Sequence, residues 1–340
     1  MRRLLPAGLA AIGPCLLLAS TAWAQQPKEV GPSGFVTVLA GVSNTRSQFN
    51  TANENRRTGS LDDDGKSVTN AFPGALFGLR YRFASSPTEL SFGTSRESLQ
   101  EGGMPTPELG LTHELADGTR LGVSIGYDPG LSGNTWEDPF VTGERRKRTD
   151  VSGLRAEVRA DSIAGSAIGL RYRLRTRDID DEGSGNFQAA QPGSTLTPGD
   201  LDNLRRDSVE HSLVATYDLQ LGERLSLRPS LTYALTDAEG GANSSQSLKP
   251  ALVIRYNADR WDGSLTSSFG YSWYNRDNAI FDDRRNGYSA GVFALVGWKE
   301  PLGLEKWRLE LMGGTGFGNA DIDFYDSRST FGAIGITRRF

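Results

Sequence analysis

Apolar and polar residues alternate strictly along segment 107–127. Leu109 and Leu111 share one parity of the first half, and small or polar residues fill the other. The alternation stops at the pair Asp117-Gly118, which is typical of a tight turn, and resumes through Val123 with the same period. A period of two is that of a β-strand, so this segment predicts a β-hairpin.

Each strand of this hairpin has one continuously apolar face and one small, polar or charged face. Such a hairpin suits a barrel wall with lipid outside and water inside. About 14 segments of this kind (range ~12 to 16) follow one another along the chain, with short and long connections in turn and Tyr or Trp near their ends. The sequence therefore predicts an all-β fold: a transmembrane, antiparallel, up-and-down β-barrel with short periplasmic turns and long extracellular loops.

The amino-terminal segment has the organisation of a secretory signal peptide. Arg2 and Arg3 precede an apolar run to Leu18, and a small-residue pattern ends at Ala24. We expect residues 1–24 to be cleaved, 25–33 to form a short periplasmic segment and 34–340 to form the barrel. The roughly ten residues between the cleavage site and the first strand are too few for the plug domain of a large plugged transporter.

The composition narrows the class of protein further. Mean hydropathy is −0.41, and the part after the signal has no apolar run near the ~18 residues of a membrane helix. The single cysteine of the chain, Cys15, lies in the signal peptide, so the exported part has none. Without Arg2 and Arg3, 35 basic residues face 41 acidic ones, a net charge of −6, so no nucleic-acid partner is expected.

These features together predict the outer membrane of a Gram-negative cell, with membrane lipid and lipopolysaccharide as surroundings. The final residue, Phe340, shares a face with Ile334 and Ile336, a pattern that such barrels present to their assembly machinery. Arg338 interrupts this apolar face, and we expect its long side chain to reach the headgroups at the periplasmic rim.

The parity opposite the apolar one is rich in basic residues and is expected to face the lumen. Its basic candidates are Arg80, Arg82, Arg155, Arg159, Arg171, Arg173, Arg175, Arg228 and Arg255. One interpretation is a water-filled path whose lining favours anionic solutes. The alternative is an Arg/Glu network that only supports the wall, since narrow barrels fill their interiors with side chains.

One acidic loop has the spacing of a calcium-binding loop. Asp178, Asp180 and Glu182 occupy positions 1, 3 and 5, and Gly183 occupies position 6. Ala189 stands where a bidentate Glu is needed, and no flanking helix pattern is present. A calcium ion and an ordinary solvated acidic loop both remain open, and no other cofactor is expected.

An outer-membrane hydrolase would require a nucleophile and a base. The chain has two histidines, His113 and His211, which share parity with lipid-facing leucines on well-separated strands. We therefore expect rim positions for both histidines, and no enzymatic activity.

Several loop motifs span nearly the whole exported chain. They are TSRES (94–98), TWEDPFVTG (135–143), TDVSG (149–153), RDIDDEGSG (177–185), PSLTY (229–233), ANSS (242–245), IFDDRR (280–285) and NADIDFYD (319–326). In these motifs the chain resembles an uncharacterised bacterial outer-membrane family known only as a domain of unknown function. The resemblance implies a barrel without an assigned activity.

The most family-like segments are expected external loops. This suggests that Trp136, Glu137, Asp138 and Phe140 form a pore constriction or a ligand-contacting lid. The alternative is that they pack their loop onto the rim.

The sequence favours a monomeric, porin-like channel that passively passes small hydrophilic solutes and prefers anions. One alternative is a surface receptor or structural barrel with a closed lumen. Another is a carrier for apolar molecules, which would require an apolar lumen patch and a lateral opening.

Overall fold

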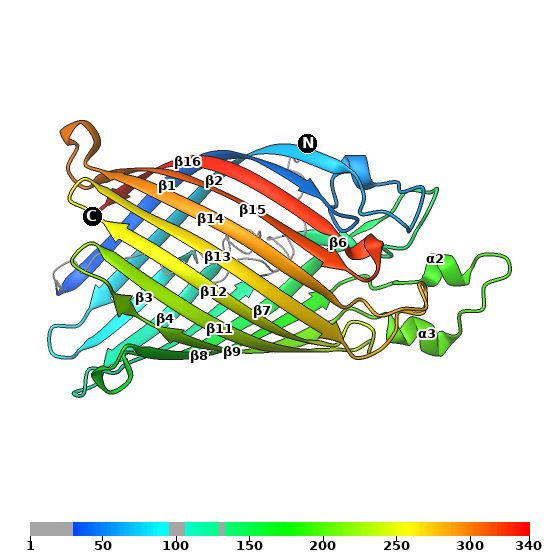
Figure 1. Cartoon of the computed structure of the whole chain (residues 1–340), viewed down its shortest axis with the longest axis horizontal. Helices are drawn as coiled ribbons and strands as arrows, with labels where there is room; N and C mark the ends of the chain where they lie inside the picture. Colours follow the sequence, from blue (N-terminus) through cyan, green and yellow to red (C-terminus); the bar gives the residue numbers. More distant parts are fainter. Residues whose placement is uncertain (1–29, 95–105, 129–132) are drawn as a thin grey trace.

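The computed structural model describes residues 30–94, 106–128 and 133–340. The expected signal peptide, 1–24, lies outside these residues, as do residues 95–98 of the first loop motif. The described residues form a barrel of tilted strands (Figure 1). The strands are β1 (Gly31–Arg46), β2 (Ser67–Arg82), β3 (Thr88–Thr94), β4 (Pro107–Glu114), β5 (Arg120–Asp128), β6 (Asn134–Trp136), β7 (Arg148–Asp161), β8 (Ile168–Ile179), β9 (Ser208–Tyr217), β10 (Leu219–Gln220), β11 (Leu225–Ala238), β12 (Ser245–Asn257), β13 (Trp261–Tyr274), β14 (Gly287–Lys299), β15 (Trp307–Ala320) and β16 (Ser327–Arg339).

The barrel is closed and antiparallel throughout. Strands that follow one another in the chain pair in order, and β16 pairs with β1 from Phe35↔Arg339 to Arg46↔Arg328. β10 continues β9 after one residue, and β6 pairs only with β7, so the wall built from the described residues has 14 strands. Phe340 completes the closure, because its backbone N–H donates to the Gly34 carbonyl at 3.0 Å. The expected up-and-down barrel is confirmed.

The outer surface of the wall is apolar. Val123 is 51 % exposed, and its lipid-side neighbours Leu121, Ile125 and Tyr127 are similarly open, as the hairpin pattern predicted. Aromatic residues gather at the ends of strands: the Trp261 and Trp298 rings stack with centroids 5.5 Å apart at the periplasmic end. A soluble protein does not leave a continuous apolar band in water, whereas a bilayer stabilises one.

Arg338 lies on this outer face at the periplasmic end of β16. Its guanidinium carbon lies 5.5 Å from the centre of the Trp307 ring. Tryptophan in a membrane protein concentrates at the headgroup level, so the contact is consistent with the rim position expected for Arg338.

Several strands are longer than the alternation predicts. β1 begins at Gly31 and β2 at Ser67, although the apolar alternation of the second strand is clear only from about Leu76. The first half of β2 carries its large apolar residues, Val68 and Phe72, on the inward parity and contains Pro73, so the outward apolar period is weak there. Its pairing with β1 runs the full length from Gly31↔Arg82 to Arg46↔Ser67, and the ladder overrides the local preference.

The connections at the two ends of the barrel differ in length, as expected (Figure 1). The longest described one, between β8 and β9, carries the short helices α2 (Asn186–Ala189) and α3 (Pro198–Asn203). Single 3₁₀ turns are η1 (Asn53–Asn55), η2 (Ile163–Gly165), η3 (Pro301–Gly303) and η4 (Asp323–Tyr325). In the described ranges, no helix is both long and apolar enough to cross a membrane.

Candidate functional site

Strands β7 and β8 carry the densest group of charged lumen side chains. Their register places Glu157 beside Arg173, and Arg159 beside Arg171. These side chains point away from the exposed apolar face, and Arg173 is only 4 % exposed. Arg171 Nε and Arg173 Nη2 approach different oxygens of Glu157 at 3.3 and 3.2 Å. Arg159 Nη1 lies 4.0 Å from Glu157 Oε1 as well, so one carboxylate is shared by three guanidinium groups.

Positive charge exceeds negative charge on this part of the lumen. Between residues 153 and 175, the inward positions of β7 and β8 hold five arginines and two acids. The arginines are Arg155, Arg159, Arg171, Arg173 and Arg175, and the acids are Glu157 and Asp161. The ion pairs fit a supporting network, and the surplus of arginine fits an anion-favouring path.

The other predicted lumen cations lie on the inner face of the remaining strands. Arg80 of β2 pairs with Glu89 of β3 at 3.5 Å, and from β7 Arg155 reaches Glu108 of β4 at 3.3 Å. The structure therefore distributes the predicted cations around much of the ring. Arg82 lies at the periplasmic end of β2, Arg228 on β11 next to Asp218, and Arg255 on β12.

A second lumen feature was not predicted from the sequence: an apolar wall on β14, β15, β16, β1 and β2. It consists of two clusters that share Phe72: Phe293, Leu295, Met312, Ala333 and Phe331 form one, and Phe35, Leu39 and Leu76 form the other. A signal was present, because segments 35–42 and 291–297 are apolar on both parities. A strand apolar on both faces has an apolar inner surface as well as a lipid-facing one.

The external connections fold into one body, which we call the loop cap: residues 47–66, 133–147, 180–207, 239–244, 275–286 and 321–326. It has its own apolar core, in which the Phe140 and Phe324 rings lie 5.3 Å apart. The buried core residues are Phe140, Leu204, Ala242, Ile322 and Phe324, and Phe49, Leu61, Ile280, Phe281 and Tyr325 pack against them. Most family-like loop motifs thus meet in one cluster.

The topology places this core across the mouth of the barrel. The six segments of the loop cap leave the wall after β1, β5, β8, β11, β13 and β15, which are spaced around the whole ring. Segments from opposite sides meet only above the lumen. For example, Phe324, which follows β15, contacts Phe140, which follows β5 on the far side of the ring, while Phe49 of the neighbouring loop after β1 stacks on Tyr325.

Trp136 lies at the centre of the polar half of the loop cap. Its side chain is fully buried, and its indole N–H donates to the Gln48 carbonyl at 2.9 Å. The guanidinium of Arg146 lies 4.6 Å above the ring and donates to the carbonyls of Gln48 at 3.0 Å and Asn55 at 3.1 Å. Burial lowers the pKa of Arg146 to about 10, so it remains a cation at neutral pH.

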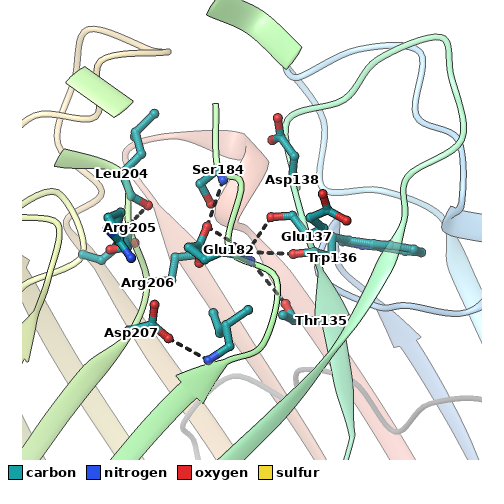
Figure 2. A network of polar contacts seen from close by, with 12 residues as sticks. Thr135, Trp136, Glu137, Asp138, Glu182, Ser184, Leu204, Arg205, Arg206 and Asp207 are labelled. Carbon is teal, nitrogen blue, oxygen red and sulfur yellow. Dashed lines mark hydrogen bonds and ion pairs between the residues drawn. The ribbon is translucent and has the colours of Figure 1, made fainter. Parts of the chain in front are cut away.

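Arg206 ties the loop before β9 to the loop before β7 (Figure 2). Its Nη2 donates to the carbonyls of Trp136 at 2.7 Å and Glu137 at 2.9 Å, and its Nε donates to Glu182 at 2.8 Å. Both charged side chains of this pair are almost completely buried. A guanidinium that satisfies backbone carbonyls as well as a carboxylate fixes two loops at once.

Asp138 receives three backbone hydrogen bonds. The donors are the N–H groups of Phe187 at 2.8 Å, Phe140 at 2.9 Å and Gly185 at 3.1 Å. Burial raises the pKa of the Asp138 carboxyl, and these hydrogen bonds oppose the rise in part. Its neighbour Glu137 pairs with the exposed Lys147 at 2.7 Å. The four proposed constriction residues therefore all belong to the loop cap, and three of them are internal to it.

The three predicted calcium ligands occupy different surroundings in the structure. Asp178 ends β8, Asp180 is exposed, and Glu182 accepts the hydrogen bonds of Arg206. The described residues contain no group of three or more His, Cys, Asp and Glu side chains placed to hold a metal ion.

Both histidines bond to neighbours across the sheet. His113 Nδ1 lies 2.8 Å from the Thr88 hydroxyl near the periplasmic end of β4, and His211 Nδ1 lies 2.6 Å from the Tyr172 hydroxyl near the external end of β9. The two sites lie at opposite ends of the barrel. The described contacts give each histidine a local partner and bring no acid–base pair together.

Comparison with known proteins settles the family. Residues 31–338 match the family described as "Protein of unknown function (DUF2860)". The chain belongs to this family. The resemblance seen in the loop motifs is thereby confirmed, and no curated protein matches the sequence.

Solved structures with a similar course of the chain are outer-membrane proteins. The outer membrane channel DcaP of Acinetobacter baumannii has 9 % identity and a TM-score of 0.42, over 91 % of this chain and 98 % of that one. An anion-selective porin from Comamonas acidovorans has 10 % identity and a TM-score of 0.42, over 92 % and 100 %. These values are too low to transfer a property of either protein to this chain.

Proposed function

We propose that the protein is a passive, porin-like channel in the outer membrane that passes small hydrophilic solutes and prefers anions. The observation that carries this proposal is the surplus of arginine on the inner face of β7 and β8. Fixed cations along a wet path lower the energy of an anion within it and raise that of a cation. The apolar outer surface supports the location in a membrane.

The loop cap supports a constricted external mouth. Its core joins segments from opposite sides of the ring, so a solute must pass beside or through it. We propose that Trp136, Asp138 and Phe140 act mainly by holding this cap together, because their side chains are buried within it.

Planar-bilayer recording tests the channel and its preference together. The variant Arg171→Gln/Arg173→Gln/Arg175→Gln removes three lumen cations, among them the two guanidinium groups nearest Glu157. We expect a severalfold fall in the chloride-to-potassium permeability ratio. One charge acts on an ion ~10 Å away in water with roughly 0.4 kcal/mol, and three such effects accumulate.

Arg338→Gln is the matched control, because it removes the same charge from the outer face beside Trp307. Its permeability ratio is expected to equal that of the wild type. An unchanged ratio in the triple variant would assign the three arginines to the supporting network alone.

A closed surface receptor or structural barrel is the second candidate. The observation that favours it is the loop cap, whose buried core and internal Arg206 bonds resemble those of a small folded domain. The same recording separates the two functions, since a folded, inserted barrel without any ionic current would support the closed form.

A further inference from the structure

The apolar wall of the lumen is formed by large side chains that lie flat over glycines. Phe35 covers Gly78 on the neighbouring strand, Leu39 covers Gly74, and Phe72 covers Gly41. A methyl group at Gly74 would lie 2.7 Å from Leu39 Cδ1, too close for any real contact. The absence of a Cβ at these positions therefore lets these side chains pack directly against the neighbouring strand.

The apolar wall lies opposite the cationic strands. In the closed ring of 14 strands, β15 is seven places from β7, and β16 is seven places from β8. Met312 of β15 and Phe331 of β16 thus lie half a turn from Arg155 and Arg173. The apolar clusters lie mainly in the middle of their strands, with the Arg308–Glu310 ion pair on the periplasmic side of Met312, and the arginines lie in the middle and periplasmic half of β7 and β8, so the middle of the lumen has an apolar side and a basic side.

Hydroxyl groups line the wall between these two sides. Ser230 of β11 and Thr266 and Ser268 of β13 are more than nine-tenths buried, and Thr266 is 1 % exposed. Among the described residues, their side-chain oxygens make no hydrogen bond, and the same holds for Thr232. These hydroxyls make the wall between the two sides polar.

We propose that the lumen binds organic anions that carry an apolar body, such as medium-chain carboxylates. The aliphatic or aromatic body lies on the Phe293, Met312 and Phe35 side, and the carboxylate faces the arginines of β7 and β8. The inference rests on the proposed channel function, and it specifies the solute class of that channel. Burial of each methylene on an apolar surface strengthens binding by up to about fourfold, since it contributes ~0.8 kcal/mol.

Binding is measured on the full barrel in phosphatidylcholine nanodiscs by equilibrium dialysis with radiolabelled octanoate, acetate and octyltrimethylammonium. Empty nanodiscs correct for partition into lipid. We expect octanoate to bind at least tenfold more tightly than acetate, because acetate lacks the chain. We also expect it to bind at least tenfold more tightly than octyltrimethylammonium, because that cation has the wrong charge.

Two variants separate the two sides of the lumen. Phe293→Ser/Met312→Ser should weaken octanoate binding at least tenfold and leave acetate unchanged. Val292→Ser is the matched control, since Val292 adjoins Phe293 but faces outward and is exposed. Arg171→Gln/Arg173→Gln/Glu157→Gln removes the cations together with their shared carboxylate and should weaken octanoate and acetate alike.

Folding of each variant is verified by its heat-modifiable migration in gels. Equal binding of octanoate and octyltrimethylammonium would overturn the proposal, as would equal binding of octanoate and acetate. Because dialysis needs no current, a barrel that conducts but binds no octanoate refutes this inference alone. A barrel that binds octanoate but carries no current refutes the channel function alone.

Discussion

Arg206 in the loop cap and Arg173 in the lumen are both almost fully buried, yet they bind different partners. Arg206 donates to the backbone carbonyls of Trp136 and Glu137 as well as to Glu182. Arg173 bonds to the Glu157 side chain, which Arg171 also approaches. A guanidinium group bound to backbone carbonyls organises the backbone. Several guanidinium groups around one carboxylate leave a net positive charge in the lumen. Arg206 should therefore control the stability of the loop cap, and Arg173 the ion selectivity of the lumen.

The largest effect is expected from Arg206→Met. The change leaves the carboxylate of Glu182 buried without its cation, which costs about 3 to 5 kcal/mol. The loop cap should loosen, so limited proteolysis should cut within 180–207 much faster, and single-channel conductance should rise. The barrel strands should remain protected.

Arg205→Met is the control for this variant. Arg205 pairs with Glu239, but both side chains are about half exposed, and such a pair contributes less than ~1 kcal/mol. If the two variants were cleaved at the same rate, the organising role assigned to Arg206 would be wrong.

Phe324→Ala should have the next largest effect. Phe324 is fully buried at the centre of the loop cap and contacts Phe49, Phe140 and Phe281. Loss of the ring leaves a cavity and costs about 3 kcal/mol. Hydrogen exchange should show faster opening of all six cap segments together, whereas Leu302→Ala on a periplasmic turn, with 88 % exposure, should change nothing.

Faster exchange in segment 321–326 alone would mean that the six segments do not share one core.

The alternation of the strands predicted none of this core, and the reason is physical. A period of two reveals which face of a strand meets lipid, so the 14 strands and their inner arginines were predictable. The contact between Phe140 and Phe324 joins loops far apart in the chain, and no local pattern encodes such a contact.

The lumen was predicted only in part for a related reason. The arginines at 171, 173 and 175 alternate with Leu170, Tyr172 and Leu174, so their inward direction could be derived. In segment 291–297 both parities are apolar, and alternation alone does not separate Phe293 from Val292. The ladder with β13 and β15 decides which of the two points inward.

Glu157→Gln tests the role assigned to the lumen arginines, and its effect is expected to be smaller than those of the loop-cap variants. It removes the carboxylate shared by Arg171 and Arg173, so the anion preference should rise. A change of about twofold in the chloride-to-potassium permeability ratio is expected from one charge ~10 Å from the ion. Glu144→Gln removes an exposed acid of the loop cap and should leave the ratio unchanged. A fall of the ratio in Glu157→Gln would mean that the arginines no longer face the path.

The smallest expected effect concerns pH and Asp138. Burial raises the pKa of this carboxyl in the closed loop cap, so the closed form binds a proton more tightly than an opened one. Its stability should therefore be greatest below the ordinary pKa of about 3.9 and decrease as pH rises through the raised value. Asp326, whose pKa burial also raises, acts in the same direction.

Hydrogen exchange of the cap segments between pH 4 and 7 measures this dependence, after correction for the intrinsic exchange rate. Asp138→Asn should reduce it, because the amide does not titrate. A loop cap that becomes steadily less stable as pH falls from 7 to 4 would contradict the expected direction.

The reversal potential of the wild-type barrel in a tenfold potassium chloride gradient tests the anion preference of the lumen most directly. An anion-favouring lumen predicts a current whose reversal potential is displaced toward the chloride equilibrium potential. Displacement toward the potassium potential would contradict the role assigned to the arginines of β7 and β8, and a folded, inserted barrel without current would contradict the channel itself.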